Sequence, residues 1–427
     1  MIKQTFILLF FPVFLHAQKV PAIAVLFDSL KTHPASISDD ILIKQANAGK
    51  TMAYSKLYPN VDFFGRYDYA SVATGMVPVP PDELMIMVKD PTVAQPFSEN
   101  IYRLGATISM PVFVASIFST AAKAQMMAHS AEGQKTINLL KNEAVIVSAN
   151  ANLLYLQALN QALEQKKNSL LKTKEFVVIK VNNGRAPESA LLNISNGIHQ
   201  IDILKNDLAL QREEVAALIK SLTGITLTEP IPMEQIGTFK DGGIKALDPL
   251  REKVDADRLG LRAEKNKLLP ALMLQGSYIN NFANSYNNNQ FINNDYANIG
   301  IMLKVPILAM DQYAQIKKSR LDYDASKNEL DKLSLDFAAQ AEQLQKSLLL
   351  IESSIGLYGN SIQEKEQLLA IAKVSYQSDQ LSMEDYLKYE DDVVLEQSKL
   401  FKAQAQKWQT LVKLNVIYGN NIEEVVK

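Results

Sequence analysis

The stretch LYPNVDFFGRY at residues 57–67 recurs in altered form as LLPALMLQGSY at residues 268–278, 211 positions later. Both copies keep a Leu-x-Pro, a Gly and a Tyr at matching places. A second pair of motifs follows, LGATISMP at 104–111 and IGIMLKVP at 299–306, and these lie 195 positions apart. The second copy is therefore shorter between its two motifs, where a tolerant surface loop is expected. The chain is a duplication that contains two versions of one fold.

The first residues have the features of a secretory signal peptide. Lys3 precedes an apolar run from Phe6 to Leu15, and Ala17 supplies a small residue at the expected cleavage site, so we expect Gln18 to begin the mature chain. Ten apolar residues are too few to span a bilayer as a helix, and no later run reaches eighteen. The chain has no cysteine, which excludes a disulfide framework and lipid attachment at the cleavage site.

The duplication and the signal peptide predict four segments. Residues 1–17 form the signal peptide, 18–224 the first structural repeat, 225–246 a linker, and 247–427 the second repeat. The linker contains two prolines and two adjacent glycines. We interpret it as a connection within one fold, because the matching motifs of the two halves keep a constant spacing along the chain.

The composition favours long helices and argues against several functions. Among 427 residues 47% are apolar, but only 17 are Gly and one is Trp, which is unusual for a β-rich globule. The formal net charge is −2 and the basic residues are scattered, so the sequence shows no basic patch of the kind that binds nucleic acid. The histidines are isolated, so no metal site is expected. No nucleophile, base and orienting group stand together, so we expect neither an enzyme nor a cofactor.

Both motifs of each half have the two-residue period of β-strands. In the first, Val61, Phe63 and Tyr67 alternate with polar residues, and only Phe64 breaks the polar face. Alternation over about ten residues is typical of membrane barrel strands, and a half-buried sheet of a soluble protein has the same pattern. A Pro-rich stretch at 72–98 and an Asn-rich run at 280–294 are interpreted as the loops between strands.

Helical patterns fill the remaining chain. A short helix is expected at about 38–56. A proline-free stretch after Pro111 predicts a helix to about residue 181, a turn at 182–187 and a return helix that ends before Gly224. The second half repeats this arrangement, with helices at about 311–377 and from Ser382 to near Gly419. Ser382 and Asp385 form a capping-box-like pair at the start of the last helix.

This order of elements resembles the TolC-like outer membrane efflux protein family. The resemblance implies an α plus membrane β-barrel fold, internally duplicated, in which a long α-helical coiled-coil tunnel joins four β-strands per protomer in a trimeric 12-stranded barrel. It implies a homotrimer in outer membrane lipid, with the tunnel in the periplasm. The function implied is a passive exit duct of a tripartite efflux or type I secretion system, with a periplasmic adaptor and an inner-membrane pump of RND or ABC type. The alternative is a soluble periplasmic helical scaffold.

The resemblance also assigns residues. The family narrows its tunnel at the helix turns with a Tyr and two acids three residues apart, which correspond here to Tyr376, to Asp385, and to a second position that holds Lys388 instead. The predicted constriction also includes Glu384. Lys388 is expected to weaken the acidic ring or to pair with Asp385 and Asp391 along the helix; a solvated helix face is the alternative interpretation.

With this resemblance, the alternation of residues along each strand predicts which face of the sheet contacts lipid and which contacts water. The strand–helix junctions are expected at Pro59, Pro111, Pro270 and Pro306. The residues expected to face lipid are Val61, Phe63, Tyr67, Leu272, Leu274 and Tyr278, and those expected to face a water-filled lumen are Asp62, Arg66, Asp68, Gln275 and Ser277.

Overall fold

The computed structural model describes residues 22–378 and 380–427. The predicted signal peptide and the mature end at Gln18 lie outside the described residues. The described elements are α1 (Ile23–Thr32), α2 (Pro34–Ser55), β1 (Asn60–Gly75), α3 (Pro81–Lys89), β2 (Phe97–Phe113), α4 (Ala115–Asn182), α5 (Glu188–Thr223), η1 (Lys245–Leu247), α6 (Asp248–Asn266), β3 (Ala271–Asn284), β4 (Phe291–Lys304), α7 (Met310–Gln377), α8 (Met383–Tyr418) and η2 (Ile422–Glu424).

Corresponding helices of the two halves have equal lengths. α4 and α7 each contain 68 residues, and α5 and α8 each contain 36. Both return helices end at a left-handed glycine, Gly224 with φ 73° and Gly419 with φ 64°, a backbone conformation that costs glycine little. Helix α4 ends before Gly184, which has φ 69°, and the Arg185 N–H donates to the Lys180 carbonyl over 2.8 Å. The long helices, their turns and their glycine ends are as the sequence predicts.

Two helices differ from the expectations. The chain before residue 38 forms α1, whose buried residues Ile23, Leu26, Phe27 and Leu30 have the spacing of one helical face. The Pro-rich stretch between β1 and β2 contains α3, which starts with Pro81 in its first turn, where a missing N–H costs nothing. The prediction of plain loop at 72–98 was therefore incomplete.

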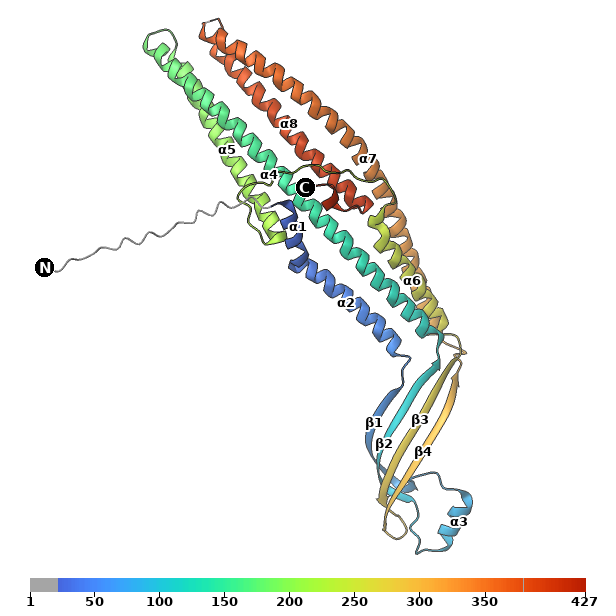
Figure 1. Ribbon diagram of the computed structural model, residues 1–427. Helices are drawn as coiled ribbons and strands as arrows, with labels where there is room; N and C mark the ends of the chain where they lie inside the picture. The colour runs from blue at the N-terminus through green and yellow to red at the C-terminus, as the bar shows by residue number, and fades with distance from the viewer. Residues whose placement is uncertain (1–21, 379) are drawn as a thin grey trace, which may run out of the picture. The chain divides into compact units, whose positions relative to one another are not determined.

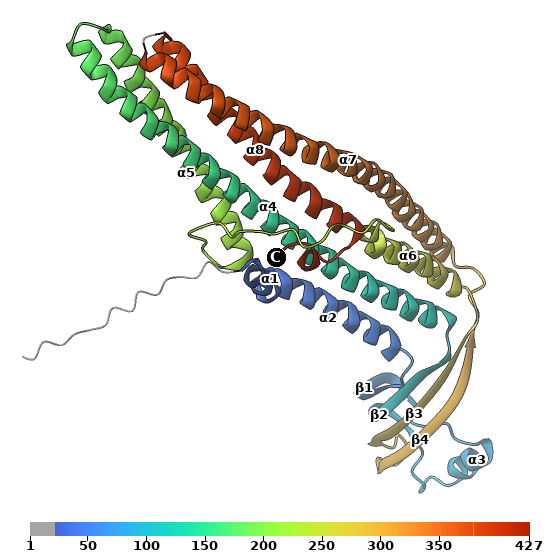
Figure 2. The same ribbon diagram turned by 45° about the horizontal axis from the view of Figure 1, so that its top comes forward.

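Figures 1 and 2 show α4 with α5, and α7 with α8, as two antiparallel hairpins. Residues 22–38, 135–246 and 336–427 form one compact unit, which contains both turns. On α4, Leu156, Leu163, Leu170 and Val177 are buried at intervals of seven residues. The buried residues of α5 in the same cluster are Ile194, Ile198, Ile201 and Leu208. Their spacings of four, three and seven residues are those of a coiled-coil seam.

The linker belongs to the same unit and packs closely. Asn150 on α4 is fully buried, its amide donates to the Ile231 carbonyl over 2.7 Å, and its side-chain oxygen accepts from the Ile231 N–H over 2.9 Å. Both backbone groups of Ile231 are thereby satisfied away from water. A bridge between Gln235 and Val426 joins the linker to the end of the chain.

Residues 39–134 and 247–335 form a second compact unit, which contains the sheet. Its four antiparallel strands lie in the order β1-β2-β3-β4. The strands extend further into the Asn-rich run than expected, because only residues 285–290 separate β3 from β4. Cross-strand side-chain bonds stabilise this extension, among them Asn280 to Asp295. The interpretation of 280–294 as a loop was wrong for most of its length.

Candidate functional site

Tyr376, predicted at the constriction, lies in the core between the two hairpins. Only 8% of it is exposed, and its ring stacks on Tyr386 with centroids 5.2 Å apart. Phe176 on α4 packs edge-on against it at 6.3 Å, and the Lys180 ammonium lies 5.2 Å from its ring centroid. These aromatic and cation–π contacts join the end of α4 to α7 and α8.

A buried acid lies one turn along α8 from Tyr386. Glu390 is 3% exposed, and its Oε1 accepts hydrogen bonds of 2.5 Å from the hydroxyls of Ser169 and Tyr386. Its Oε2 has no hydrogen-bond partner. Burial first, and then the bond to Glu390, raise the pKa of the Tyr386 phenol to about 12. The phenol therefore remains a donor throughout the neutral range.

Asp385 lies in the first turn of α8, and Ser382 caps the start of the helix as the sequence predicts. Its backbone N–H donates to Ser382 Oγ over 3.1 Å, and its carboxylate accepts from the Ser382 hydroxyl over 2.6 Å. Among the described residues no ion pair joins Lys388 to Asp385 or Asp391, the second of the two expectations for Lys388; Asp385 binds Ser382, and Asp391 pairs with Lys166 of α4. Lys388 and Glu384 are both exposed.

The sheet has one apolar and one polar face, with the parity that the sequence predicts. Strand register places Val61 opposite Ile108, Leu274 opposite Ile301, and Gly276 opposite Ile299 on the apolar face. This face is uncovered: 84% of Phe63, 77% of Ile299 and 70% of Ile301 are exposed. Toward the end of the sheet that carries the β1–β2 and β3–β4 connections, here called its outer end, three rings from successive strands pack together. Tyr102 stacks on Phe282 at 5.6 Å and lies 5.0 Å from Tyr67, tilted by 38°. An apolar band bordered by aromatic rings is typical of a lipid-facing barrel surface.

Phe64, which breaks the polar pattern, has a packing role. It pairs directly with Gly105 of β2, and its ring lies over the space that a side chain at Gly105 would occupy. A Cβ at residue 105 would lie 3.0 Å from Phe64 Cζ. The aromatic ring thus covers a glycine across the strands.

Charged residues cluster at the outer end of the polar face. Asp68 pairs with Arg66 and Arg103 over 2.9 and 2.8 Å. Arg103 also donates from Nη1 to Asn281 Oδ1 over 2.7 Å. Oriented hydrogen bonds on three neighbouring strands give this face the character of a water-exposed surface.

Prolines lie close to each change between helix and strand. Pro59 and Pro270 directly precede β1 and β3, where no ladder N–H is needed. Pro111 lies inside the last residues of β2 at a shift in register, and Pro306 follows the end of β4.

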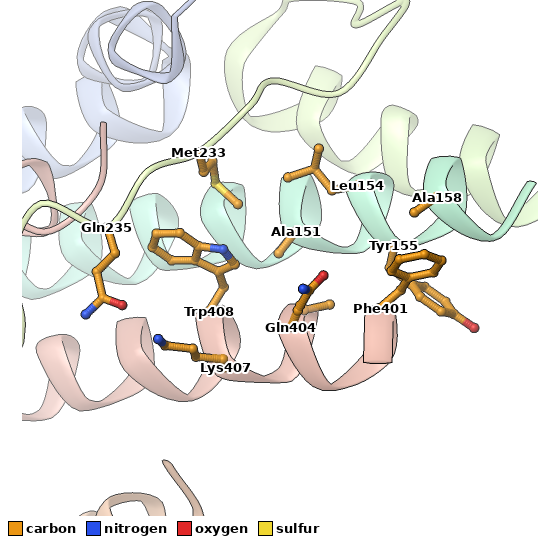
Figure 3. A pocket seen from close by; sticks show the side chains of 11 residues that line it. Ala151, Leu154, Tyr155, Ala158, Met233, Gln235, Phe401, Gln404, Lys407 and Trp408 are labelled. Carbon is orange, nitrogen blue, oxygen red and sulfur yellow. The ribbon is translucent and has the colours of Figure 1, made fainter. Parts of the chain in front are cut away.

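A groove of about 440 Å³ lies between α4, α8 and the linker (Figure 3). Tyr155, Phe401 and Trp408 supply aromatic walls, and Lys407 at its edge pairs with Glu352 over 2.9 Å. Across the described part of the chain, no group of three or more His, Asp or Glu side chains is placed to hold a metal ion.

Solved outer membrane channels have the same architecture. The outer membrane protein VceC from Vibrio cholerae matches over 93% of this chain and 96% of its own, with a TM-score of 0.76 and 15% identity. The Campylobacter jejuni CmeC channel matches over 93% of this chain and 85% of its own, with a TM-score of 0.75 and 16% identity. The chain has the TolC-like channel fold. The open Neisseria gonorrhoeae MtrE channel gives a TM-score of 0.74 at 12% identity, over 94% of this chain and 89% of its own.

This likeness confirms the expected fold class of long helices with four antiparallel strands per chain, which the resemblance implies. No model of a known protein family and no curated protein matches the sequence. At such low identity the likeness establishes the fold, and the roles of single residues must come from this chain. Among residues 22–378 and 380–427, none of the helices has an apolar stretch long enough to cross a membrane.

The cluster of Ser169, Tyr386 and Glu390 in this TolC-like fold was not predicted from the sequence. Glu390 lies among the charged residues of α8, and its burial results from contact with α4. The i, i+4 spacing of Tyr386 and Glu390 was the one available signal.

Proposed function

We propose that three copies of this chain form an outer membrane exit duct of a tripartite efflux or type I secretion system. The helices line a periplasmic tunnel, and each copy contributes four strands to one barrel. A periplasmic adaptor and an inner-membrane pump of RND or ABC type deliver the substrate, and the duct itself is passive.

The uncovered apolar face of the sheet is the observation that carries this proposal. Phe63, Ile299 and Ile301 on that face are more than two-thirds exposed, and such surface is unstable in water. Within the described residues β1 pairs only with β2, and β4 only with β3, so both outer strands have unpaired edges. In lipid those edges must be closed, which three copies of a four-stranded sheet achieve. The apolar face then meets lipid and the Asp68 face meets the lumen.

The first test is fractionation of cells that express the full chain. We expect recovery from the outer membrane in detergent, as an oligomer that heat converts to monomer on a denaturing gel. Purified protein inserted into a planar bilayer should conduct ions. Complete recovery in the soluble periplasmic fraction, with no conductance, would favour the helical scaffold instead.

The channel proposal includes a constriction at the hairpin turns that involves Tyr376, Glu384, Asp385 and Lys388. Asp385 is exposed at the first turn of α8, where three copies around an axis would place three carboxylates. Such a ring attracts cations. Tyr376 contributes differently, because its ring is packed against Tyr386 and fixes the end of α7.

Asp385→Asn is expected to reduce block of the channel by multivalent cations by about tenfold, the loss of roughly 1.4 kcal/mol of binding. Asn retains an oxygen that accepts from Ser382, so the helix start is preserved and the charge alone is removed. Single-channel recordings with hexaamminecobalt measure the block. Glu364→Gln, on an exposed acid of α7 outside the proposed constriction, is the matched control. Unchanged block in Asp385→Asn would remove this residue from the constriction.

A further inference from the structure

The segment between β1 and β2 is fastened to the polar face of the sheet at its outer end. Met76, the first residue after β1, is 2% exposed and packs on Ile101 and Ala283, with Ile292 beside them. Strand register puts these three residues on the face of Asp68 and Arg103. Arg103 Nη1 also donates to the Met76 carbonyl over 3.1 Å. The segment therefore leaves the sheet from the polar face.

The other end of the segment is held by the short β3–β4 turn. The Gln95 N–H donates to Asn287 Oδ1 over 3.0 Å, and Ser285 Oγ donates to the Gln95 carbonyl over 2.7 Å. Asn287 and Asn288 donate to the carbonyls of Val93 and Thr92 over 2.9 and 3.1 Å. With both ends bound, the position of α3 between them is fixed by the sheet.

Helix α3 carries apolar side chains that nothing in the described part of its chain covers. It has no buried residue, and Met85, Ile86 and Val88 are 64%, 68% and 63% exposed. Figures 1 and 2 both show α3 standing clear of the strands beside the outer ends of β3 and β4. Three large apolar side chains on one nine-residue helix require a cover.

We propose that α3 packs against its two symmetry copies and forms an apolar constriction across the outer mouth of the channel. This inference rests on the proposed trimeric channel, in which the polar face surrounds the lumen. A segment that leaves the sheet from that face lies on the lumen side and away from lipid. Threefold symmetry brings the same segments of the other two copies toward the same axis, and we assign the cover of α3 to them. An apolar ring of this kind restricts ion flow by dewetting.

Because the chain has no cysteine, contact between copies of α3 can be tested by disulfide cross-linking through a single introduced cysteine. In Met85→Cys the new thiol is the only one, and mild oxidation of the purified channel should yield dimers that a reductant dissolves. Gln290→Cys on the β3–β4 turn is the matched control, since residue 290 is exposed and lies off α3. We expect the Met85 variant to form most of its molecules into pairs and the control to remain monomeric after denaturation. Equal monomer in both variants would overturn the proposal.

A conductance measurement tests the constriction itself. The triple variant Met85→Ser, Ile86→Ser and Val88→Ser should raise single-channel conductance by about twofold or more, because water wets a hydroxyl-lined opening. Met85→Leu, Ile86→Leu and Val88→Leu, which keep the helix apolar and its charges unchanged, should leave it within about a fifth of the wild-type value. If wild type conducts and the triple serine variant conducts equally, α3 does not form a constriction, while the proposed channel function is retained. If wild type itself gives no channel, the proposed function fails, and this inference fails with it.

Discussion

Replacing Gly105 with alanine is expected to destabilise the sheet by about 3 kcal/mol, the cost of overpacking a tightly packed site. The new Cβ would lie 2.6 Å from the Tyr278 carbonyl oxygen of β3 and about 3 Å from the Phe64 ring of β1. The carbonyl belongs to the backbone of the next strand, so it cannot move without disturbing the ladder between β2 and β3. The ratio of folded to unfolded protein should fall about a hundredfold, as the midpoint of heat conversion from oligomer to monomer will reveal.

Gly243 in the linker supplies the control for this substitution. A Cβ there meets nothing within 4 Å, and the residue lies away from the strand edges that pair in the proposed trimer. Gly243→Ala should therefore change stability by less than about 0.5 kcal/mol. Phe64→Ala in the Gly105→Ala background should not restore stability, because the contact with the Tyr278 carbonyl remains. Equal midpoints for the two alanine variants would contradict the packing argument.

Glu143→Gln is expected to abolish a loss of stability that the wild type suffers as pH rises. Glu143 on α4 is 3% exposed, and its Oε2 has no hydrogen-bond partner. Burial first, and then the charge of Glu423, raise its pKa to about 7, while Lys31 opposes the shift. Lys31 itself pairs with Glu423 over 2.9 Å and Asp28 over 3.1 Å, which raise its pKa.

The direction of the effect follows from proton binding. The folded protein holds the Glu143 proton up to about pH 7, whereas the unfolded chain releases it near the ordinary value of 4.5. Folding is therefore favoured fully below pH 4.5, and that contribution is lost as pH rises through 7. The ionised, buried form costs roughly 3 kcal/mol at pH 8 relative to pH 4.

Urea unfolding followed by circular dichroism from pH 4 to 8 measures this contribution. Glu143→Gln, neutral at every pH, should be more stable than wild type by roughly 3 kcal/mol at pH 8 and nearly equal to it at pH 4. Glu175→Gln, on an exposed glutamate of the same helix, is the matched control and should follow the wild-type profile. Parallel profiles for Glu143→Gln and wild type would show that folding does not shift the pKa of Glu143.

Features encoded within a short stretch of sequence could be predicted, and features that depend on packing between distant segments could not. The glycine ends at Gly224 and Gly419 and the cap at Ser382 each depend on a few neighbouring residues. The burial of Glu390 depends on Ser169, more than 200 positions earlier, so its own sequence surroundings give no sign of it. Lys388 was assigned partners from helical spacing, but Ser382 and Lys166 bind those acids instead.

Helices α1 and α3 were missed for different reasons. Ile23, Leu26, Phe27 and Leu30 have the spacing of one helical face. The helix was not predicted because these residues follow directly after the apolar signal peptide. The prolines around α3 indicate a loop, and one of them, Pro81, instead opens a helix. Its position is fixed by Gln95 and Asn287, which lie 192 residues apart in the chain.

The equal lengths of the paired helices restrict how proteins of this design can change in evolution. Lengthening α4 alone would shift its seam against α5 and would leave α7 and α8 shorter than their counterparts. A change is tolerated only when all four helices gain or lose the same number of residues. Because Leu156, Leu163, Leu170 and Val177 recur every seven residues, that number must be a multiple of seven, or about 10 Å of helix. Proteins of this fold should therefore differ in helix length by discrete steps.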